Sequence, residues 1–405
     1  MKIKTITLIF FSCLFIGCTQ NSQKGKADKQ MNGASKEVKS TDFSDNINVY
    51  NKRYDITFNG ADRKRTVKAA DIFKYIRYIP LETNNSSLLD DSPRNVFLKN
   101  NSIYVFDSRG PSEDELFLFN QDGKFLYHIG RKGQGAKEYL GGLHIAVSNK
   151  GIVSILNRIG SAIISYTTDN EFVSRIRMDS VAMYNGIYLN DSLLLVKNWH
   201  DNPNYKFHVV DIYKKKVVKS FGPVTKRRMY TLAYPEMFTR YRGKVLSSEF
   251  QSNEILELTG DTAMVRYIIN INDKMPPEGF WDQKVSTFSI IVDEEARKGY
   301  IGHIPSFAEN DNSIFLYFRG SSSKDEYMGM AIIDKATGKH QSFKYLSLAD
   351  NVIIKDRYFY PQNDGVVVFT VSPEDILNSG NKEFISQFPG LKEDDNQILM
   401  VAELK

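Results

Sequence analysis

Short runs of hydrophobic residues, separated by turn-forming residues, dominate the chain from about residue 47 onward. Few stretches keep helical spacing over ten residues, whereas Gly, Asn and Asp recur between the apolar runs at intervals typical of β-strands. The stretch Ser102–Gly130 reads as a strand, a loop, a second strand, a tight turn at Gln121–Gly123 and a further strand. This pattern predicts an all-β domain.

The same pattern then repeats along the chain. Further copies begin at about Gly151, Ser192, Lys244 and Ser313, with a degenerate one from Arg357. A period of roughly 40 to 70 residues suits four-stranded propeller blades with insertions. We therefore expect residues 47–405 to form a six-bladed β-propeller of four-stranded antiparallel blades. An open sandwich is the alternative, but it would leave two sheet edges exposed.

Segments outside the repeats add detail to this expectation. The stretch Ile72–Glu82 precedes the first copy and has no blade of its own, so we expect it to complete the last blade and close the ring. The largest insertion, Asp273–Glu309, contains a predicted helix at Val292–Lys298. A second short helix is predicted at Ser372–Leu377.

The N-terminal residues 1–17 have the pattern of a secretory signal peptide. Two lysines precede an apolar run at Ile6–Ile16, which at about 1.5 Å per residue covers only about half of a bilayer core. The ending "LFIGC" resembles a bacterial lipobox, although Phe15 stands where Leu is usual. We expect cleavage before Cys18, lipidation of Cys18, and anchoring in the cell envelope at the outer membrane, on a side that the sequence leaves open.

Residues 18–46 are polar and predict a flexible tether, because they cannot bury enough apolar surface to offset ordering. The chain has two cysteines, Cys13 inside the signal peptide and Cys18. A mature chain would have no internal disulfide, so a large core must stabilise it. The net charge of +5 falls to +3 once the two signal-peptide lysines are removed, and this near balance argues against nucleic-acid binding. We expect a monomer without a cofactor.

Several segments are similar to a known family. "YIRYIPLET" (75–83), "IYVFD" (103–107), "LFLFNQDGKFLYHIG" (116–130) and "GRKGQGAKEY" (130–139) resemble bacterial six-bladed β-propeller lipoproteins, which are distant relatives of the NHL-repeat propellers. Ala136 replaces a usual Pro, and Gln397 stands where Pro is common in the last strand. The resemblance implies the propeller fold. It implies little about function, since most members have no established activity.

The run "HIGRKGQGAKEY" (128–139) has the Gly-rich, basic character of a phosphate-binding loop. A Walker A loop needs Lys-Ser/Thr after its last Gly, but Ala136 follows Gly135. A dinucleotide fingerprint needs Gly where Glu138 stands, and a helix should follow. Neither condition is met. We interpret the run as a crossing between two blades, where glycines permit positive φ.

Topology places this crossing on the same face as the loops between second and third strands. We expect that face to bind an anionic or polar ligand, or an envelope protein, since arginine suits carboxylate and phosphate groups and an aromatic ring can stack. The alternative is that the basic residues only neutralise nearby Asp and Glu. The predicted binding residues are Arg109, Arg131, Lys132, Arg158, Trp199, His200 and Arg319.

Catalytic signals are weaker. Of the six histidines, only His144 is expected on an inner strand facing the channel, where it is a weak candidate for a metal ligand. His128 and His208 fall in predicted strands and are expected to pack. We therefore expect a non-catalytic binding protein. The alternatives are a metal-assisted hydrolase or lyase with its site in the channel, and a structural subunit of an envelope complex.

Overall fold

The computed structural model describes residues 52–58, 65–90, 93–108, 114–157, 161–178, 181, 183–198, 205–223, 238–249, 252–271, 274–277, 279–282, 288–320, 328–355 and 358–405. The predicted signal peptide, Cys18 and the polar tether lie outside these residues. The chain divides into two compact units, residues 1–45 and 46–405, and all described residues belong to the second. No helix in the described ranges is both long and apolar enough to cross a membrane.

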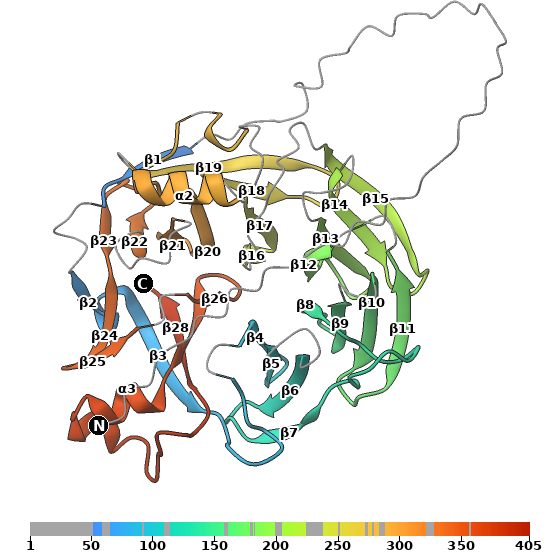
Figure 1. The fold of residues 1–405 in the computed structure, drawn as a ribbon, viewed down its shortest axis with the longest axis horizontal. Coiled ribbons are helices and arrows are strands. Elements are labelled where there is room, and N and C mark those ends of the chain that lie inside the picture. Colours follow the sequence, from blue (N-terminus) through green and yellow to red (C-terminus); the bar gives the residue numbers. More distant parts are fainter. Residues whose placement is uncertain are drawn as a thin grey trace, which may run out of the picture. The chain divides into compact units, whose positions relative to one another are not determined.

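Six sheets stand around a central axis in Figure 1 and form the blades of a β-propeller. The strands of blade 1 are β4 (Asn95–Lys99), β5 (Ser102–Ser108), β6 (Asp114–Asn120) and β7 (Phe125–His128). Those of blade 2 are β8 (Gly142–Val147), β9 (Ile152–Asn157), β10 (Ala162–Thr167) and β11 (Phe172–Arg177). Those of blade 3 are β12 (Met183–Tyr188), β13 (Leu193–Asn198), β14 (Tyr205–Asp211) and β15 (Lys216–Pro223).

The other three blades complete the ring. The strands of blade 4 are β16 (Phe238–Tyr241), β17 (Lys244–Ser248), β18 (Glu254–Leu258) and β19 (Ala263–Ile271). Those of blade 5 are β20 (His303–Glu309), β21 (Ser313–Arg319), β22 (Met328–Asp334) and β23 (His340–Phe343). Those of blade 6 are β26 (Tyr360–Pro361), β27 (Val366–Val371), β28 (Ile398–Leu404) and β3 (Phe73–Pro80).

The N-terminal part of the chain closes the ring, as the sequence predicts. Strand β3 is the outer strand of blade 6 and pairs antiparallel with β28, so that Ile79 lies opposite Leu399. A further strand, β1 (Lys52–Ile56), pairs parallel with β19 and makes blade 4 five-stranded, which the sequence does not predict. Chain segments from both ends of the domain therefore hold the same ring together.

Hydrophobic side chains fill the space between every pair of neighbouring blades. Six apolar clusters account for the six junctions, including the junction of blade 6 with blade 1, where Ile79 and Leu399 meet Val105. Because both faces of a blade are covered, β9 is buried at every residue. This closed set of junctions excludes the open sandwich, in which two sheet faces would lack a neighbour.

The junction of blades 4 and 5 also contains a buried charge network. The Glu309 carboxylate is fully buried and accepts hydrogen bonds from Arg266 at 2.8 Å, from Lys335 at 2.7 Å and from the Tyr267 hydroxyl at 2.7 Å. Removing the Glu309 carboxylate would leave Lys335 without its acidic partner and Arg266 with Glu257 alone, which is costly.

Smaller elements decorate the ring. Strands β2 (Thr66–Lys68), β24 (Tyr345–Ala349) and β25 (Val352–Ile354) form a three-stranded sheet beside blade 6. The helices are α1 (Ala69–Ile72), η3 (Phe280–Asp282), α2 (Phe288–Lys298), α3 (Pro373–Asn378) and α4 (Lys382–Ile385). The two predicted helices correspond to α2 and α3.

One predicted boundary is wrong. The insertion expected at Asp273–Glu309 ends earlier, because its last seven residues form β20, the inner strand of blade 5. The sequence "HIPSFAE" of this strand is mixed in polarity, yet all seven residues are buried. Burial on both sheet faces and by the neighbouring strand removes the alternation that usually reveals a strand.

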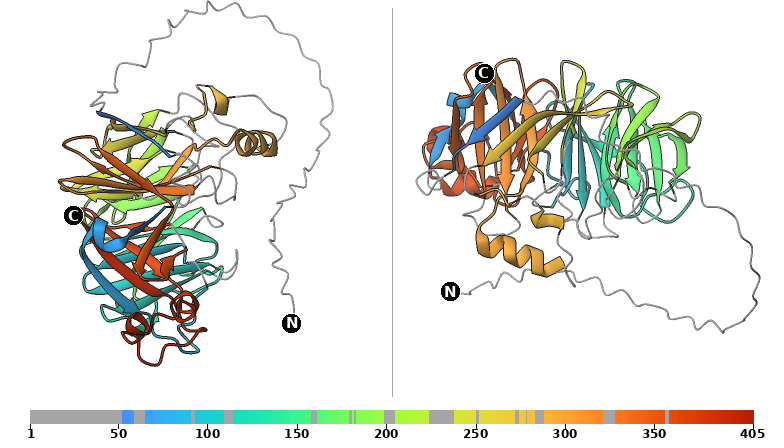
Figure 2. Two further views of the ribbon diagram at one scale, coloured as in Figure 1. Left: turned by 90° about the vertical axis from the view of Figure 1, so that its left-hand side faces the viewer. Right: turned by 90° about the horizontal axis from the view of Figure 1, so that it is seen from above.

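The antiparallel meander gives the ring two different sides. The turn side carries the short connections between first and second strands and between third and fourth strands. The loop side carries the connections between second and third strands and the crossings between blades. The crossing that contains α2 lies on the loop side, where the orange helix projects from the ring in Figure 2.

Candidate functional site

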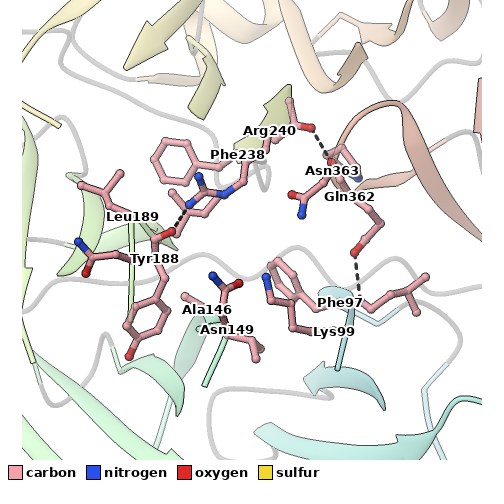
Figure 3. Close-up of a pocket in the computed structure, with 17 residues that line it drawn as sticks. Phe97, Lys99, Ala146, Asn149, Tyr188, Leu189, Phe238, Arg240, Gln362 and Asn363 are labelled. Carbon is pink, nitrogen blue, oxygen red and sulfur yellow. Dashed lines mark hydrogen bonds between the residues drawn. The ribbon is translucent and has the colours of Figure 1, made fainter. Parts of the chain in front are cut away.

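A cavity of about 190 Å³ opens at the channel mouth on the turn side. Its walls come from five blades: the ends of β4, β8, β12 and β16, the turns that follow β8 and β12, and the turn from β26 to β27. A first strand in a propeller lies closest to the axis, so residues that end these strands meet at the mouth although they are distant in sequence. Figure 3 shows the resulting site.

The turn between β26 and β27 forms one wall by reaching toward two other blades. The Gln362 side chain accepts from Leu98 N at 3.0 Å and donates to Val96 O at 3.0 Å, which ties it to β4. On the other side, the Thr239 hydroxyl donates to Gln362 O at 2.8 Å, which ties β16 to the same turn. The wall is therefore held by hydrogen bonds to blades 1 and 4.

Arg240 supplies a positive charge to this cavity from β16. Its guanidinium donates to the carbonyl of Tyr188 on β12 and to the carbonyl of Gly243. Burial lowers the pKa of Arg240, and the Asp364 carboxylate partly offsets that effect. The two carbonyls fix the guanidinium at the edge of the cavity and leave some of its five N–H donors available.

Lys99 supplies a second positive charge from the end of β4. Burial lowers the pKa of Lys99, repulsion by Arg240 lowers it further, and attraction to Asp191 acts in the opposite direction. Among the described residues, its ammonium forms neither a hydrogen bond nor an ion pair. The cavity thus brings together two cations, and Arg240 disfavours the charged form of Lys99.

Two side-chain amides complete the polar lining. The polar ends of Lys99, Asn149 and Asn363 converge in Figure 3, and the Arg240 guanidinium reaches toward Tyr188 across the same space. The amides of Asn149 and Asn363 have no hydrogen-bond partner within the described part of the chain, and both residues are exposed. They can donate or accept, so they can adapt to a ligand.

His144, the histidine that the sequence places on an inner strand facing the channel, is buried in the structure. His144 on β8 is 2% exposed and packs edge-on against Phe97, with ring centroids 5.6 Å apart. Neither ring nitrogen makes a hydrogen bond of normal geometry with a described residue, and burial lowers the pKa of His144 to about 3. His144 does not line the cavity, although Phe97 does. In the described ranges, no three His, Cys, Asp or Glu side chains are grouped to hold a metal ion.

The residues predicted to bind on the loop side are only partly described. Arg109, Arg158, Trp199 and His200 lie outside the described residues. Arg131 and Lys132 lie in the crossing from blade 1 to blade 2, and Arg319 ends β21. The Arg319 Nε donates to Gly320 O at 3.2 Å, and no contact joins these three side chains to one another. The predicted cluster stays a prediction.

The Gly-rich crossing is indeed a cradle for an anion, but the anion belongs to the chain itself. Gly135 N donates to the Glu138 carboxylate at 2.9 Å, and Arg131 pairs with the same carboxylate at 3.3 Å. A Cβ at Gly133, where φ is +150°, would approach the Glu138 Oε2 to 2.0 Å. The glycines therefore permit the loop to close around Glu138, which occupies the place that a phosphate would take.

Comparison with known proteins places this fold and site in a family. The model of "Domain of unknown function (DUF4934)" matches residues 53–403. The chain belongs to the DUF4934 family. The match covers the whole ring, so the cavity lies within the family's domain. No curated protein matches the chain.

Solved structures are similar to this family member to different degrees. A Bacteroides fragilis protein described as exported is 17% identical with a TM-score of 0.70, covering 87% of this chain and 100% of that chain. A DUF4221 family member from Bacteroides vulgatus is 9% identical with a TM-score of 0.49, covering 82% and 97%. Virginiamycin B lyase from Staphylococcus aureus is 10% identical with a TM-score of 0.43, covering 82% and 99%. The likeness to the Bacteroides fragilis protein concerns the fold alone and transfers no activity.

Sequence reasoning missed Lys99 and Arg240, but a usable signal exists. Lys99 precedes Asn100 and Asn101, which both have positive φ, as a two-residue type I′ turn requires. Arg240 precedes a similar turn, in which Arg242 and Gly243 have positive φ. In a propeller, polar residues one or two positions before such a turn at the end of a first strand are candidates for the channel mouth.

Proposed function

We propose that this chain is a non-catalytic binding propeller of the bacterial cell envelope, held to a membrane by lipid on Cys18. Its ligand is a small polar molecule that binds in the turn-side cavity. The observation that carries this proposal is the cavity itself, whose wall is built from five blades and whose polar groups Lys99, Asn149 and Asn363 have no hydrogen-bond partner within the described residues. Concave sites with a few convergent polar groups are typical of small-molecule binding.

The envelope location rests on separate support. The lipobox-like ending at Cys18 and the resemblance to propeller lipoproteins both favour export and lipidation. The fold is shared with a Bacteroides fragilis protein that is described as exported. The side of the membrane and the natural partner are not part of the proposal.

A second candidate surface is the loop side, with Arg131, Lys132 and Arg319 among its described members. Its support is charge on exposed loops, and Arg131 is already paired with Glu138. An exposed ion pair of this kind is weak, so a partner anion could still displace the carboxylate. The loop side is therefore the alternative that an experiment must separate from the turn side.

The test uses three variants of the full chain. Asn149→Trp places a large ring at the cavity entrance, and Lys150→Trp places the same ring on the same turn at an exposed residue that does not line the cavity. Arg131→Glu reverses a loop-side charge. Thermal shift against a collection of small polar compounds identifies ligands, and calorimetry measures their dissociation constants.

The proposal predicts that Asn149→Trp abolishes ligand binding, whereas Lys150→Trp and Arg131→Glu bind like the parent chain. Loss of binding in Arg131→Glu with full binding in Asn149→Trp would place the site on the loop side and contradict the proposal.

A further inference from the structure

Resting on the proposed function, the geometry of the cavity points to the class of its ligand. We infer that the turn-side cavity binds a small oxyanion, a phosphate or carboxylate, held between the Lys99 ammonium and the Arg240 guanidinium. Asn149 and Asn363 supply further hydrogen bonds. No family description or comparison assigns this site.

The charge of the lining is the first step of the argument. Among the described residues that line the cavity, Lys99 and Arg240 are the charged ones, and none of them is Asp or Glu. A site whose walls carry two positive charges and no negative charge favours an anion over a neutral or cationic ligand.

The two nearest carboxylates do not cancel this charge, because both are held by backbone groups outside the cavity. Asp191 accepts from Lys150 N at 3.1 Å, and Asp364 accepts from Arg242 N at 2.7 Å. Neither forms an ion pair with Lys99 or Arg240 within 4.0 Å. The two carboxylates therefore reduce the positive potential at the rim of the cavity without neutralising Lys99 and Arg240.

The electrostatic cost of the empty arrangement is the second step. Partial burial lowers the pKa of both Lys99 and Arg240, and repulsion by Arg240 lowers the pKa of Lys99 further. An anion between them would relieve both effects at once. Arginine offers a planar fork and lysine a point charge, a combination that suits the oxygens of a phosphate or carboxylate.

The size of the cavity limits the ligand. A volume of about 190 Å³ corresponds to about six water molecules at roughly 30 Å³ each. This space accepts inorganic phosphate or a small dicarboxylate, and a long chain or a folded partner would have to remain outside.

The experiment titrates the full chain with two probes, inorganic phosphate and succinate, by isothermal titration calorimetry at low ionic strength. The variants are Lys99→Met, which keeps the length of the side chain without its charge, and Lys99→Arg, which keeps the charge. We expect Lys99→Met to weaken the binding of at least one probe about tenfold or more and Lys99→Arg to stay within about threefold of the parent chain. The stronger probe identifies the preferred oxyanion.

Equal binding of both probes by Lys99→Met and the parent chain would overturn the inference. That failure is distinguishable from failure of the proposed function. If Asn149→Trp abolishes binding of neutral compounds while Lys99→Met does not affect either anion, the cavity is the site and its ligand is not an oxyanion. If Asn149→Trp has no effect on any ligand, the proposed function itself is wrong.

Discussion

The buried histidine of blade 2 should make the stability of the ring depend on pH. His144 is 2% exposed, and burial lowers its pKa from 6.5 to about 3. The unfolded chain therefore takes up a proton at pH values where the folded chain does not. The folded state has its full stability above about pH 6.5 and loses it as the pH falls from there toward 3. The change that tests this is His144→Leu, which removes the titrating group and fills the space with an apolar side chain.

The expected magnitude follows from the width of this window. Each pH unit below the unfolded pKa costs about 1.4 kcal/mol of unfolding free energy while the folded state stays neutral. Between pH 7.5 and pH 5.0, His144 should remove about 2 kcal/mol, since only the part below 6.5 contributes. His144→Leu should lose about 2 kcal/mol less than the parent chain over the same interval. Because two ring nitrogens without normal hydrogen bonds are also removed, the variant should be at least as stable at pH 7.5.

The assay is urea unfolding of the full chain at both pH values, followed by circular dichroism. A matched control is Ile145→Val on the same strand, where the side chain is fully buried and carries no charge. At both pH values, this control should be less stable than the parent chain by the same amount, about 1 kcal/mol. If the parent chain and His144→Leu lose the same free energy between pH 7.5 and pH 5.0, His144 is not held neutral by burial and the reasoning is refuted.

Three further changes test the forces that close the ring, each by urea unfolding. Glu309→Ala removes the buried carboxylate that Arg266 and Lys335 share, leaves Arg266 with Glu257 alone, and should cost about 3–5 kcal/mol; a cost below about 1 kcal/mol would mean that the network is well hydrated. Ile79→Ala empties part of the junction between blades 6 and 1 and should cost about 2–4 kcal/mol, whereas an unchanged midpoint would argue against closure by β3. Gly130→Ala adds a Cβ at φ +74° within 2.7 Å of a tyrosine ring and should cost at least about 1 kcal/mol, and a neutral result would contradict the requirement for glycine there.

The strands that could be predicted from the sequence are those in the middle of the blades. In blades 1 to 5 the second strands begin at Ser102, Ile152, Leu193, Lys244 and Ser313, within one residue of the predicted repeat starts, whereas β27 of blade 6 begins at Val366, nine residues after the predicted start at residue 357. These strands are covered on both faces, so they are continuous apolar runs between turn signals. The closing role of β3 could also be inferred, because a strand without a blade of its own must pair somewhere.

The pairings of β1 and β2 could not be predicted. Strand β1 joins β19 in parallel, and β2 joins β24 in parallel to start the three-stranded sheet. Local sequence sets whether a segment is extended, but partner choice depends on which edge is free in the assembled ring. The inner strand β20 was missed for a related reason, since its polar residues are satisfied only by neighbours that the fold supplies.

The site illustrates the same limit. The crossing around Gly133 looked like an anion-binding loop because glycines and basic residues are adjacent in sequence, and Glu138 fills it in the structure. Lys99 and Arg240 are far apart in sequence and belong to no recognisable motif, yet the ring brings them into one cavity. Adjacency in sequence therefore drew attention to a loop that Glu138 already fills, whereas the residues of the cavity are brought together only by the topology of the ring.

The most direct test of the account is a crystal structure of the full chain with selenate, whose anomalous scattering locates an oxyanion without ambiguity. The account predicts a selenate in the turn-side cavity between Lys99 and Arg240, within hydrogen-bonding distance of both, and its loss in Lys99→Met crystals. A selenate bound at Arg131 and Lys132 on the loop side, with none between Lys99 and Arg240, would contradict it.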